Sequence, residues 1–223
     1  MDEPKILIYG KKMEVILKQK NVHSPSFTVG NYRLTYYQKN KGFYEKILQK
    51  LLSSLPSENP TYLYAPTWED YENNSSWKDF FPYLLKTLPD SVNLIIKPHP
   101  NTWMKNPFEI ERIFYPYETK KNILLLTDFM PVYPLLEKID AYIGDYSSIG
   151  YDFLFFNKPM FFITDKKSPM SSCGHHLEKN FSFHLMEEKR KEDSLFTPYR
   201  KKLYDYTFDN VALCPQSLQQ FPV

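Results

Sequence analysis

The sequence predicts an α/β fold in which a doubly wound parallel sheet is covered by helices on both faces. Apolar stretches of four to six residues recur along the chain, and helical patterns separate them. These stretches are largely apolar and do not alternate with polar residues, which is typical of strands that are buried on both faces. With 223 residues, of which 42% are hydrophobic, the chain can form one large domain, or one domain and a fragment of another.

The elements follow from periodicity and from breaker residues. Helical spacing is clearest in 32–55, where Phe43, Ile47 and Leu51 recur. Residues 101–122 are more irregular, the strand signal fades after Asp165, and the tail from 210 gives no pattern. The expected strands are 5–10, 27–30, 62–65, 92–97, 123–126, 141–144 and 160–163. The expected helices are 12–20, 32–55, 76–88, 131–139, 147–156 and 185–193.

Composition excludes several classes of function. The 28 basic and 26 acidic side chains give a net charge of +2, without the clustered excess that a nucleic-acid interface needs. The densest basic region, 189–202, alternates with acidic residues and is expected to be a solvated helix face. Weak contact of this region with anionic lipid headgroups is the alternative.

Cysteine use and hydropathy predict where the protein works. Cys173 and Cys214 are far apart in the chain, which argues against a disulfide framework and a cysteine-type zinc site and suits a reducing cytosol. No apolar stretch approaches the roughly 20 residues of a spanning helix. We therefore expect a cytoplasmic protein, with any membrane contact peripheral and at the inner face of the membrane.

Polar residues follow three of the expected strands directly. In a doubly wound sheet, ligands bind outside the carboxyl ends of the strands. Three separate strand ends that carry such groups are stronger evidence for a site than any single motif. These residues are, in chain order, Thr67, His99, Asp145, Ser147 and Ser148.

The turn Asp145-Tyr146-Ser147-Ser148 is the most specific of these motifs. It joins a strand to an expected helix, so free backbone N–H groups and the positive end of the helix dipole favour a phosphate there. The serine hydroxyls would be further donors. The alternative is structural: Ser147 caps the helix and Asp145 holds the turn.

His99 stands between Pro98 and Pro100, which restrict the backbone on both sides. An imidazole fixed at a strand end beside Lys97 could stabilise charge that develops on a departing phosphate. The alternative is a turn histidine with an ordinary hydrogen bond. Because neighbouring strand residues alternate, Lys97 could point to the opposite face.

Other candidate sites are weak. His175-His176 suggests a metal, but no carboxylate or cysteine has helpful spacing, so a surface loop is expected and no metal. The sequence holds no glycine-rich phosphate loop of the P-loop or dinucleotide type. ATP hydrolysis and hydride transfer are therefore poor hypotheses, and no cofactor is expected.

The motifs together resemble the CDP-glycerol glycerophosphotransferases, the teichoic-acid primases and polymerases of the GT-B fold. The order and spacing agree over about residues 28–165, and the stretch from Asp145 to Pro159 is the most specific part. The chain is similar to the C-terminal, donor-binding half of that fold, which is Rossmann-like. The matching segments are Tyr64-Ala65-Pro66-Thr67-Trp68, Ile96-Lys97-Pro98-His99-Pro100, Gly144-Asp145-Tyr146-Ser147-Ser148 with Asp152, and Asn157-Lys158-Pro159.

The resemblance implies a reaction and roles for these residues. Glycerol phosphate would pass from CDP-glycerol to a hydroxyl of a teichoic-acid-like polymer or lipid-linked glycan, and CMP would be released. His99, the candidate catalytic residue, would contact the donor pyrophosphate. The other implied donor-binding residues are Ser147 and Ser148 at the pyrophosphate, Lys97 beside His99, Thr67 near the phosphates, and Asp145 or Asp152 near the glycerol or holding the phosphate loop.

Two departures from the family limit what the resemblance implies. Glu69 stands where the family usually has an arginine, so donor binding should be weaker. The family's N-terminal domain carries a His-Gly histidine that acts as the base on the acceptor hydroxyl, and this chain has no His-Gly pair. We therefore expect 1–30 to be a remnant of that domain's end, 31–209 to be the donor-binding domain and 210–223 a tail.

Half of the expected cleft would then come from elsewhere. A separate N-terminal-domain chain is an expected partner. The alternatives are another nucleotide-sugar glycosyltransferase or epimerase built on the same half, and a catalytically dead nucleotide-binding or interaction domain.

Overall fold

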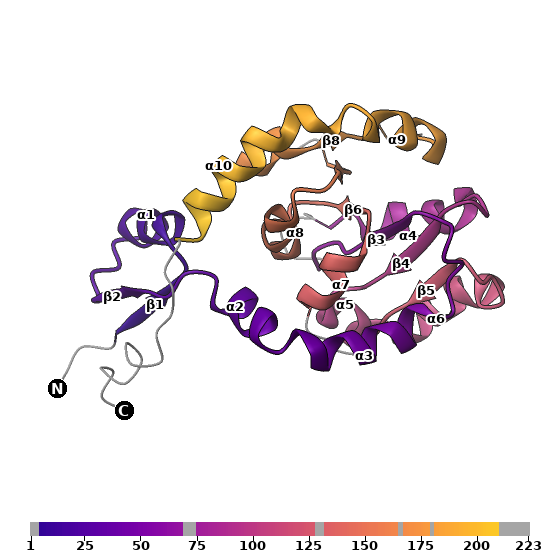
Figure 1. The fold of residues 1–223 in the computed structure, drawn as a ribbon, viewed down its shortest axis with the longest axis horizontal. Coiled ribbons are helices and arrows are strands. Elements are labelled where there is room, and N and C mark those ends of the chain that lie inside the picture. Colours follow the sequence, from indigo (N-terminus) through magenta and orange to yellow (C-terminus); the bar gives the residue numbers. More distant parts are fainter. Residues whose placement is uncertain (1–4, 69–74, 128–131, 165–166, 179–180, 210–223) are drawn as a thin grey trace.

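A computed structural model describes residues 5–68, 75–127, 132–164, 167–178 and 181–209, and these form two sheets (Figure 1). The larger sheet is six-stranded and parallel throughout, in the order β5-β4-β3-β6-β7-β8. The chain winds outward from β3 in one direction and then returns to start again at β6. This is the order of a doubly wound nucleotide-binding fold, and its switch point lies between β3 and β6. The strands are β3 (Thr61–Tyr64), β4 (Asn93–Ile96), β5 (Ile123–Leu125), β6 (Ala141–Gly144), β7 (Met160–Phe162) and β8 (His175–His176).

Two cores lie on the two faces of this sheet, because neighbouring strand residues point to opposite sides. Tyr62 and Tyr64 of β3 enter one core, and Leu63 enters the other. All four residues of β4 and of β6 are buried. The continuously apolar strands of the sequence are therefore explained by burial on both faces, and the predicted fold class is confirmed.

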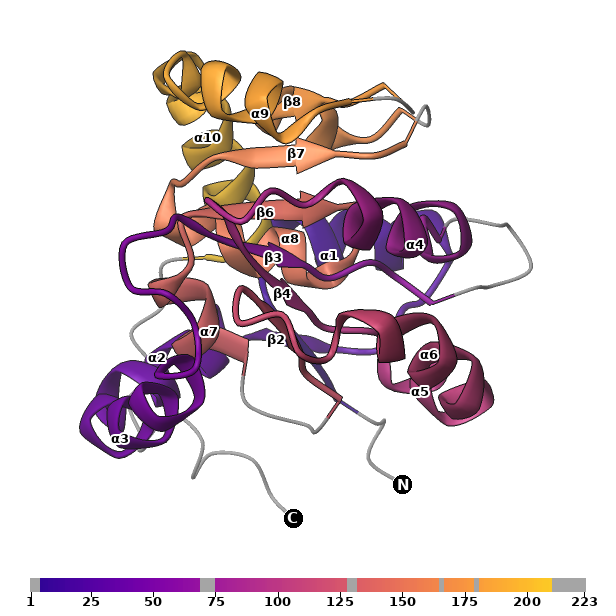
Figure 2. The same ribbon diagram turned by 90° about the vertical axis from the view of Figure 1, so that its right-hand side faces the viewer.

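Helices cover both faces, and Figure 2 shows α4 and α6 on one side of the strands and α3 and α7 on the other. The first face packs against α4 (Trp77–Thr87), α5 (Pro100–Lys105), α6 (Pro107–Phe114) and α9 (Phe183–Arg190). The second packs against α3 (Lys41–Leu52), α7 (Val132–Lys138), α8 (Ser148–Phe153) and α10 (Thr197–Thr207). Four short 3-10 helices join them: η1 (Tyr115–Tyr117), η2 (Leu154–Phe156), η3 (Pro169–Cys173) and η4 (Asp193–Phe196).

Several local predictions were wrong. The single helix expected over 32–55 is two helices, α2 (Tyr32–Lys39) and α3, which meet at Asn40. The irregular stretch 101–122 contains α5, α6 and η1. His175-His176 is not a surface loop but the edge strand β8, with the His175 ring buried against Phe161 at 5.4 Å between centroids. A two-residue strand leaves no periodic pattern to detect.

The basic region 189–202 is only partly the expected solvated face. Arg200, in the first turn of α10, is completely buried. Its guanidinium donates to both carboxylate oxygens of Asp193 and, through Nε, to the Cys173 carbonyl oxygen at 2.7 Å. The alternation of charges in the sequence did not indicate this burial, because α10 turns one of its basic residues toward the edge of the sheet.

The first residues form a small separate unit: β1 (Ile6–Ile8), α1 (Lys11–Gln19) and β2 (Ser26–Thr28), with β1 and β2 paired in parallel. The end of α10 reaches this unit (Figure 1), and the Asp209 N–H donates to the Tyr9 carbonyl oxygen at 3.1 Å. A Cβ at Gly10 would lie 2.7 Å from the Asp209 nitrogen, so only glycine allows this approach. The predicted boundary near residue 30 lies between β2 and α2; that 1–30 is a remnant stays a prediction.

Candidate functional site

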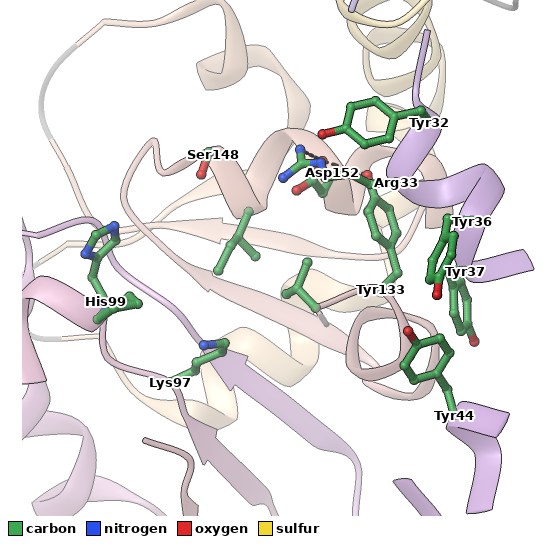
Figure 3. A pocket seen from close by; sticks show the side chains of 13 residues that line it. Tyr32, Arg33, Tyr36, Tyr37, Tyr44, Lys97, His99, Tyr133, Ser148 and Asp152 are labelled. Atoms are coloured by element: carbon green, nitrogen blue, oxygen red, sulfur yellow. Dashed lines mark hydrogen bonds and ion pairs between the residues drawn. The ribbon is translucent and has the colours of Figure 1, made fainter. Parts of the chain in front are cut away.

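A cavity of about 500 Å³ opens at the carboxyl end of β4, between α2, α7 and α8 (Figure 3). It joins segments that lie far apart in the sequence, and it contains four of the seven residues predicted for the site: Lys97, His99, Ser148 and Asp152. Its lining is Tyr32, Arg33, Tyr36, Tyr37, Tyr44, Lys97, His99, Pro100, Val132, Tyr133, Ser148, Ile149 and Asp152.

Lys97 lies in the wall of this cavity and is only 7% exposed. Burial lowers the pKa of its ammonium group. Within the described ranges no carboxylate pairs with that ammonium group. The idea that Lys97 could face away from His99 was wrong, since both line one cavity. Both residues follow β4, which ends at Ile96, so the alternation of strand residues does not decide their direction.

His99 is held by its own helix. It is the N-cap of α5, and its Nδ1 accepts a hydrogen bond from the Asn101 N–H at 3.1 Å. The neutral ring therefore carries its proton on Nε2. Burial, with a smaller contribution from Lys97, lowers the pKa of His99. Trp68 stacks on the ring at 6.2 Å between centroids. His99 thus makes the ordinary hydrogen bond that the structural alternative predicted, and its Nε2–H is still available as a donor.

The two serines of the predicted phosphate turn point in different directions. Ser148, the first residue of α8, is exposed and lines the cavity. The Ser147 hydroxyl is buried and contacts the Tyr142 hydroxyl at 2.8 Å and the Ala65 carbonyl at 3.1 Å. No side-chain hydrogen bond from Ser147 caps α8. A contact between Ser147 and phosphate remains a prediction, and with this geometry it falls to the backbone N–H.

Asp145 holds the chain across the switch point. Its carboxylate accepts from the Thr67 N–H at 2.8 Å, the Ser76 N–H at 3.1 Å and the Ser76 hydroxyl at 3.2 Å. Asp145 therefore holds its turn, as the structural alternative predicted, and it also holds the segment that follows β3. Neither Thr67 nor Asp145 lines the cavity, and their roles toward a donor stay predictions. Glu69, the position of the missing arginine, lies outside the described residues.

Asp145 should leave a signature in the pH dependence of stability. Burial raises the pKa of its carboxyl to about 6, although the bonds from Thr67 and Ser76 oppose that shift. The folded chain therefore binds this proton more tightly than the unfolded chain does, so this group's contribution to the free energy of unfolding falls as pH rises from about 4 to about 6, by about 2–3 kcal/mol.

Urea unfolding at a series of pH values, compared between the wild type and Asp145→Asn, checks this expectation. The difference in unfolding free energy between the two proteins should change by that amount across pH 4–6 and stay constant above pH 7. Parallel pH profiles would contradict it.

Asp152 is buried at the other side of the cavity. Its Oδ1 accepts from Arg33 Nη2 at 2.8 Å and from the Tyr133 hydroxyl at 2.7 Å. Burial raises the pKa of Asp152, and Arg33 opposes that shift. Asn31 supports the pair, because its Oδ1 lies 2.8 Å from the Tyr133 hydroxyl. The carboxylate and guanidinium form one charge-balanced unit that is exposed to the cavity on its Arg33 side.

Sequence reasoning missed the aromatic part of the site. Five tyrosines line the cavity, and three of them, Tyr32, Tyr36 and Tyr37, belong to α2. The i,i+4 spacing of Tyr32 and Tyr36 was a usable signal, since it places these two side chains on one side of the helix. The stretch 32–55 that contains them was predicted to be helical, and no role at a site was predicted for them.

Two further properties concern the described residues alone. No cluster of three or more His, Cys, Asp or Glu side chains in them could hold a metal ion. None of the helices formed by these residues has both the length and the hydropathy needed to cross a bilayer.

Comparisons with known proteins find similar sequences and similar folds. A family described as CDP-glycerol:poly(glycerophosphate) glycerophosphotransferase matches residues 31–172. The teichoic acid glycerol-phosphate primase of Bacillus spizizenii is 33% identical over 111 residues, which are 49% of this chain and 27% of that protein.

Solved structures show the same fold. The wall teichoic acid polymerase TagF aligns with a TM-score of 0.63 at 19% identity, covering 92% of this chain and 53% of that one. The UDP-GlcNAc 2-epimerase of Neisseria meningitidis, bound to UDP-GlcNAc, aligns at 0.54 and 14% identity, over 88% and 58%. The chain therefore spans about half the length of these structures and about a quarter of the primase.

Proposed function

This chain belongs to the CDP-glycerol:poly(glycerophosphate) glycerophosphotransferase family, and on that premise we propose that its cavity binds a CDP-linked glycerol donor. The chain would serve as the donor-binding half of an enzyme that transfers glycerol phosphate to a hydroxyl. Support for the donor class also comes from the fold, which the chain shares with a TagF structure soaked with CDPG at a TM-score of 0.62.

The observation that carries this proposal is the buried lysine. A cation in a wall of low polarity costs folding free energy unless an anion compensates it. Lys97 has no carboxylate partner among the described residues, while it lines a cavity together with the Nε2–H of His99 and the hydroxyl of Ser148. All three groups donate hydrogen bonds, whereas the oxygens of a diphosphate only accept them. The bound donor would thus supply the missing counter-charge.

The reaction then assigns a role to two of these groups, Lys97 and His99. An acceptor oxygen forms a bond to the phosphorus that carries glycerol, and the bond from that phosphorus to the bridging oxygen breaks. The electron pair leaves with CMP, whose new phosphate charge Lys97 and the His99 Nε2–H stabilise where it develops. The acceptor proton passes to a base, which in this family's pattern is the His-Gly histidine of the N-terminal domain. This chain has no such pair.

The acceptor side of the cleft is therefore proposed to come from another polypeptide segment, with a polymer or lipid-linked hydroxyl as acceptor. The β1–α1–β2 unit is where such a segment would join, because it is a separate two-stranded parallel sheet attached through the end of α10. Two parallel strands alone bury little surface, and parallel sheets are normally covered on both faces.

A single substitution separates donor binding from the structural role of His99. An asparagine at this position can still accept the Asn101 N–H as an N-cap, but it lacks the Nε2–H donor. His99→Asn should therefore weaken CDP-glycerol binding about tenfold, consistent with one lost hydrogen bond to a charged group, and leave the melting temperature close to that of the wild type. His184→Asn is the matched control, because His184 is exposed on α9 and outside the cavity.

The donor class is tested in the same titration. The chain shares its fold with a UDP-GlcNAc 2-epimerase, so CDP-glycerol, CDP-ribitol and UDP-glucose are compared side by side. Preference for a CDP-linked polyol supports the proposal. Preference for UDP-glucose, or equal donor affinity in His99→Asn and the wild type, contradicts it.

A further inference from the structure

The cavity has two chemically different ends. Lys97 and His99 lie at one end, and the tyrosines of α2 and α3 lie at the other, with Asp152 and Arg33 along the wall between them (Figure 3). A donor in which a diphosphate joins a nucleoside to glycerol also has two different ends. If the diphosphate lies at Lys97 and His99, one of the two remaining parts must occupy the tyrosine end.

The hydroxyls at the tyrosine end are largely occupied within the protein. Tyr37 donates its hydroxyl to Glu137, and the Tyr133 hydroxyl lies between Asp152 and Asn31. These two side chains are 4% and 3% exposed and form the floor of this end. They present ring surface to a ligand, whereas a polyol such as glycerol needs free hydrogen-bond donors and acceptors. A flat, partly apolar group fits this end better.

Two tyrosines supply the accessible ring surface. Tyr36 is 61% exposed although it lines the cavity, and Tyr44 lies beside it, with its ring 5.9 Å from that of Tyr37. Tyr32 is less available, because Tyr9 already stacks on it at 5.9 Å and 11°. An exposed ring at the rim of a cavity contributes little to folding, so its face is free to contact a ligand in that cavity.

We propose that Tyr36 and Tyr44 form a stacking platform for the pyrimidine base of the donor. This inference rests on the proposed function and fixes the direction of the donor in the cavity. The base lies on the tyrosine rings, the diphosphate lies at Lys97 and His99, and the glycerol extends beyond His99 toward the side where the acceptor enters. Base–aromatic stacking tolerates different pyrimidines, so the platform contributes affinity more than discrimination between cytosine and uracil.

Two probes separate the ends of the cavity: CDP, which contains the base, and inorganic pyrophosphate, which does not. We expect Tyr36→Ala to bind CDP about tenfold more weakly than the wild type and to bind pyrophosphate equally well. Tyr36→Phe, which keeps the ring, should restore CDP affinity. Tyr115→Ala is the matched control, since Tyr115 is 70% exposed and lies outside the cavity.

The outcomes distinguish this inference from the proposed function. Unchanged CDP affinity in Tyr36→Ala, or an equal loss of CDP and pyrophosphate binding, overturns the platform while donor binding stands. Failure of Tyr36→Phe to restore affinity shows that the hydroxyl acts, and it also overturns a stacking role. A folded wild type that binds neither probe overturns the proposed function itself.

Discussion

Arg200→Met is expected to lower the free energy of unfolding by about 3–5 kcal/mol, the cost typical of removing one partner of a buried ion pair. Arg200 is completely buried, and Asp193 is 9% exposed. Without the guanidinium, the Asp193 carboxylate would be left desolvated and the Cys173 carbonyl would lose its donor. Methionine keeps most of the volume, so the loss reports charge and hydrogen bonding. Urea unfolding followed by circular dichroism measures it.

Neighbouring and compensating variants make this result specific. Lys201→Met, at an exposed position of the same helix, should change stability by less than about 0.5 kcal/mol. The double variant Arg200→Met with Asp193→Leu removes both charges and should recover much of the loss, because a buried pair is often replaceable by apolar side chains. A single Arg200→Met variant within 1 kcal/mol of the wild type would show that the pair does not anchor α10 to η3 and η4.

Lys97→Met is expected to change stability and function in opposite directions. Burial lowers the pKa of this ammonium group, which means that the folded chain destabilises its charge. An apolar side chain of similar length should therefore raise the free energy of unfolding by about 1 kcal/mol. The same substitution removes the proposed counter-charge of the diphosphate, and loss of a buried charge–phosphate contact should weaken CDP binding by about 2–5 kcal/mol.

The opposite signs are what make this prediction informative. If Lys97 served only packing, its replacement would lower the free energy of unfolding and leave the nucleotide affinity unchanged. Unfolding in urea gives the first quantity, and titration with CDP gives the second. Lys50→Met, at an exposed position of α3 away from the cavity, is the control and should alter neither. Destabilisation of Lys97→Met with unaltered CDP affinity would contradict the assignment of Lys97 to the site.

The sheet could be predicted because its signal is local. Strands such as β4 and β6 are buried on both faces, so they appear in the sequence as unbroken apolar runs with a polar residue at the end. The edge strand β8 could not, because His175 is buried by contacts with Phe161 and Phe196, which come from distant parts of the chain. Arg200 was misread because the packing of α10 against η3 and η4 buries it, where it meets Asp193 of η4 and the Cys173 carbonyl of η3.

The candidate site was predicted in part. Strand-end position was enough to select Lys97, His99 and Ser148, which share the cavity. Side-chain direction was not predicted, because the inward turn of the Ser147 hydroxyl depends on the Ala65 carbonyl, which follows β3, as well as on Tyr142 of the preceding strand β6. The tyrosines of α2 were missed, since a helix that precedes the sheet reaches the cavity only through its packing on α7 and α8. These two features of the site therefore depend on long-range packing, which the local sequence pattern does not reveal.

The central claim is that this chain, by itself, binds a CDP-linked polyol at the Lys97–His99 end of the cavity. Calorimetric titration of the complete chain with CDP-glycerol tests it most directly, with inorganic pyrophosphate as the competitor. We expect saturable binding of one donor per chain, displaced by pyrophosphate. Absence of binding by a folded chain, or binding that pyrophosphate leaves unchanged, would contradict the claim.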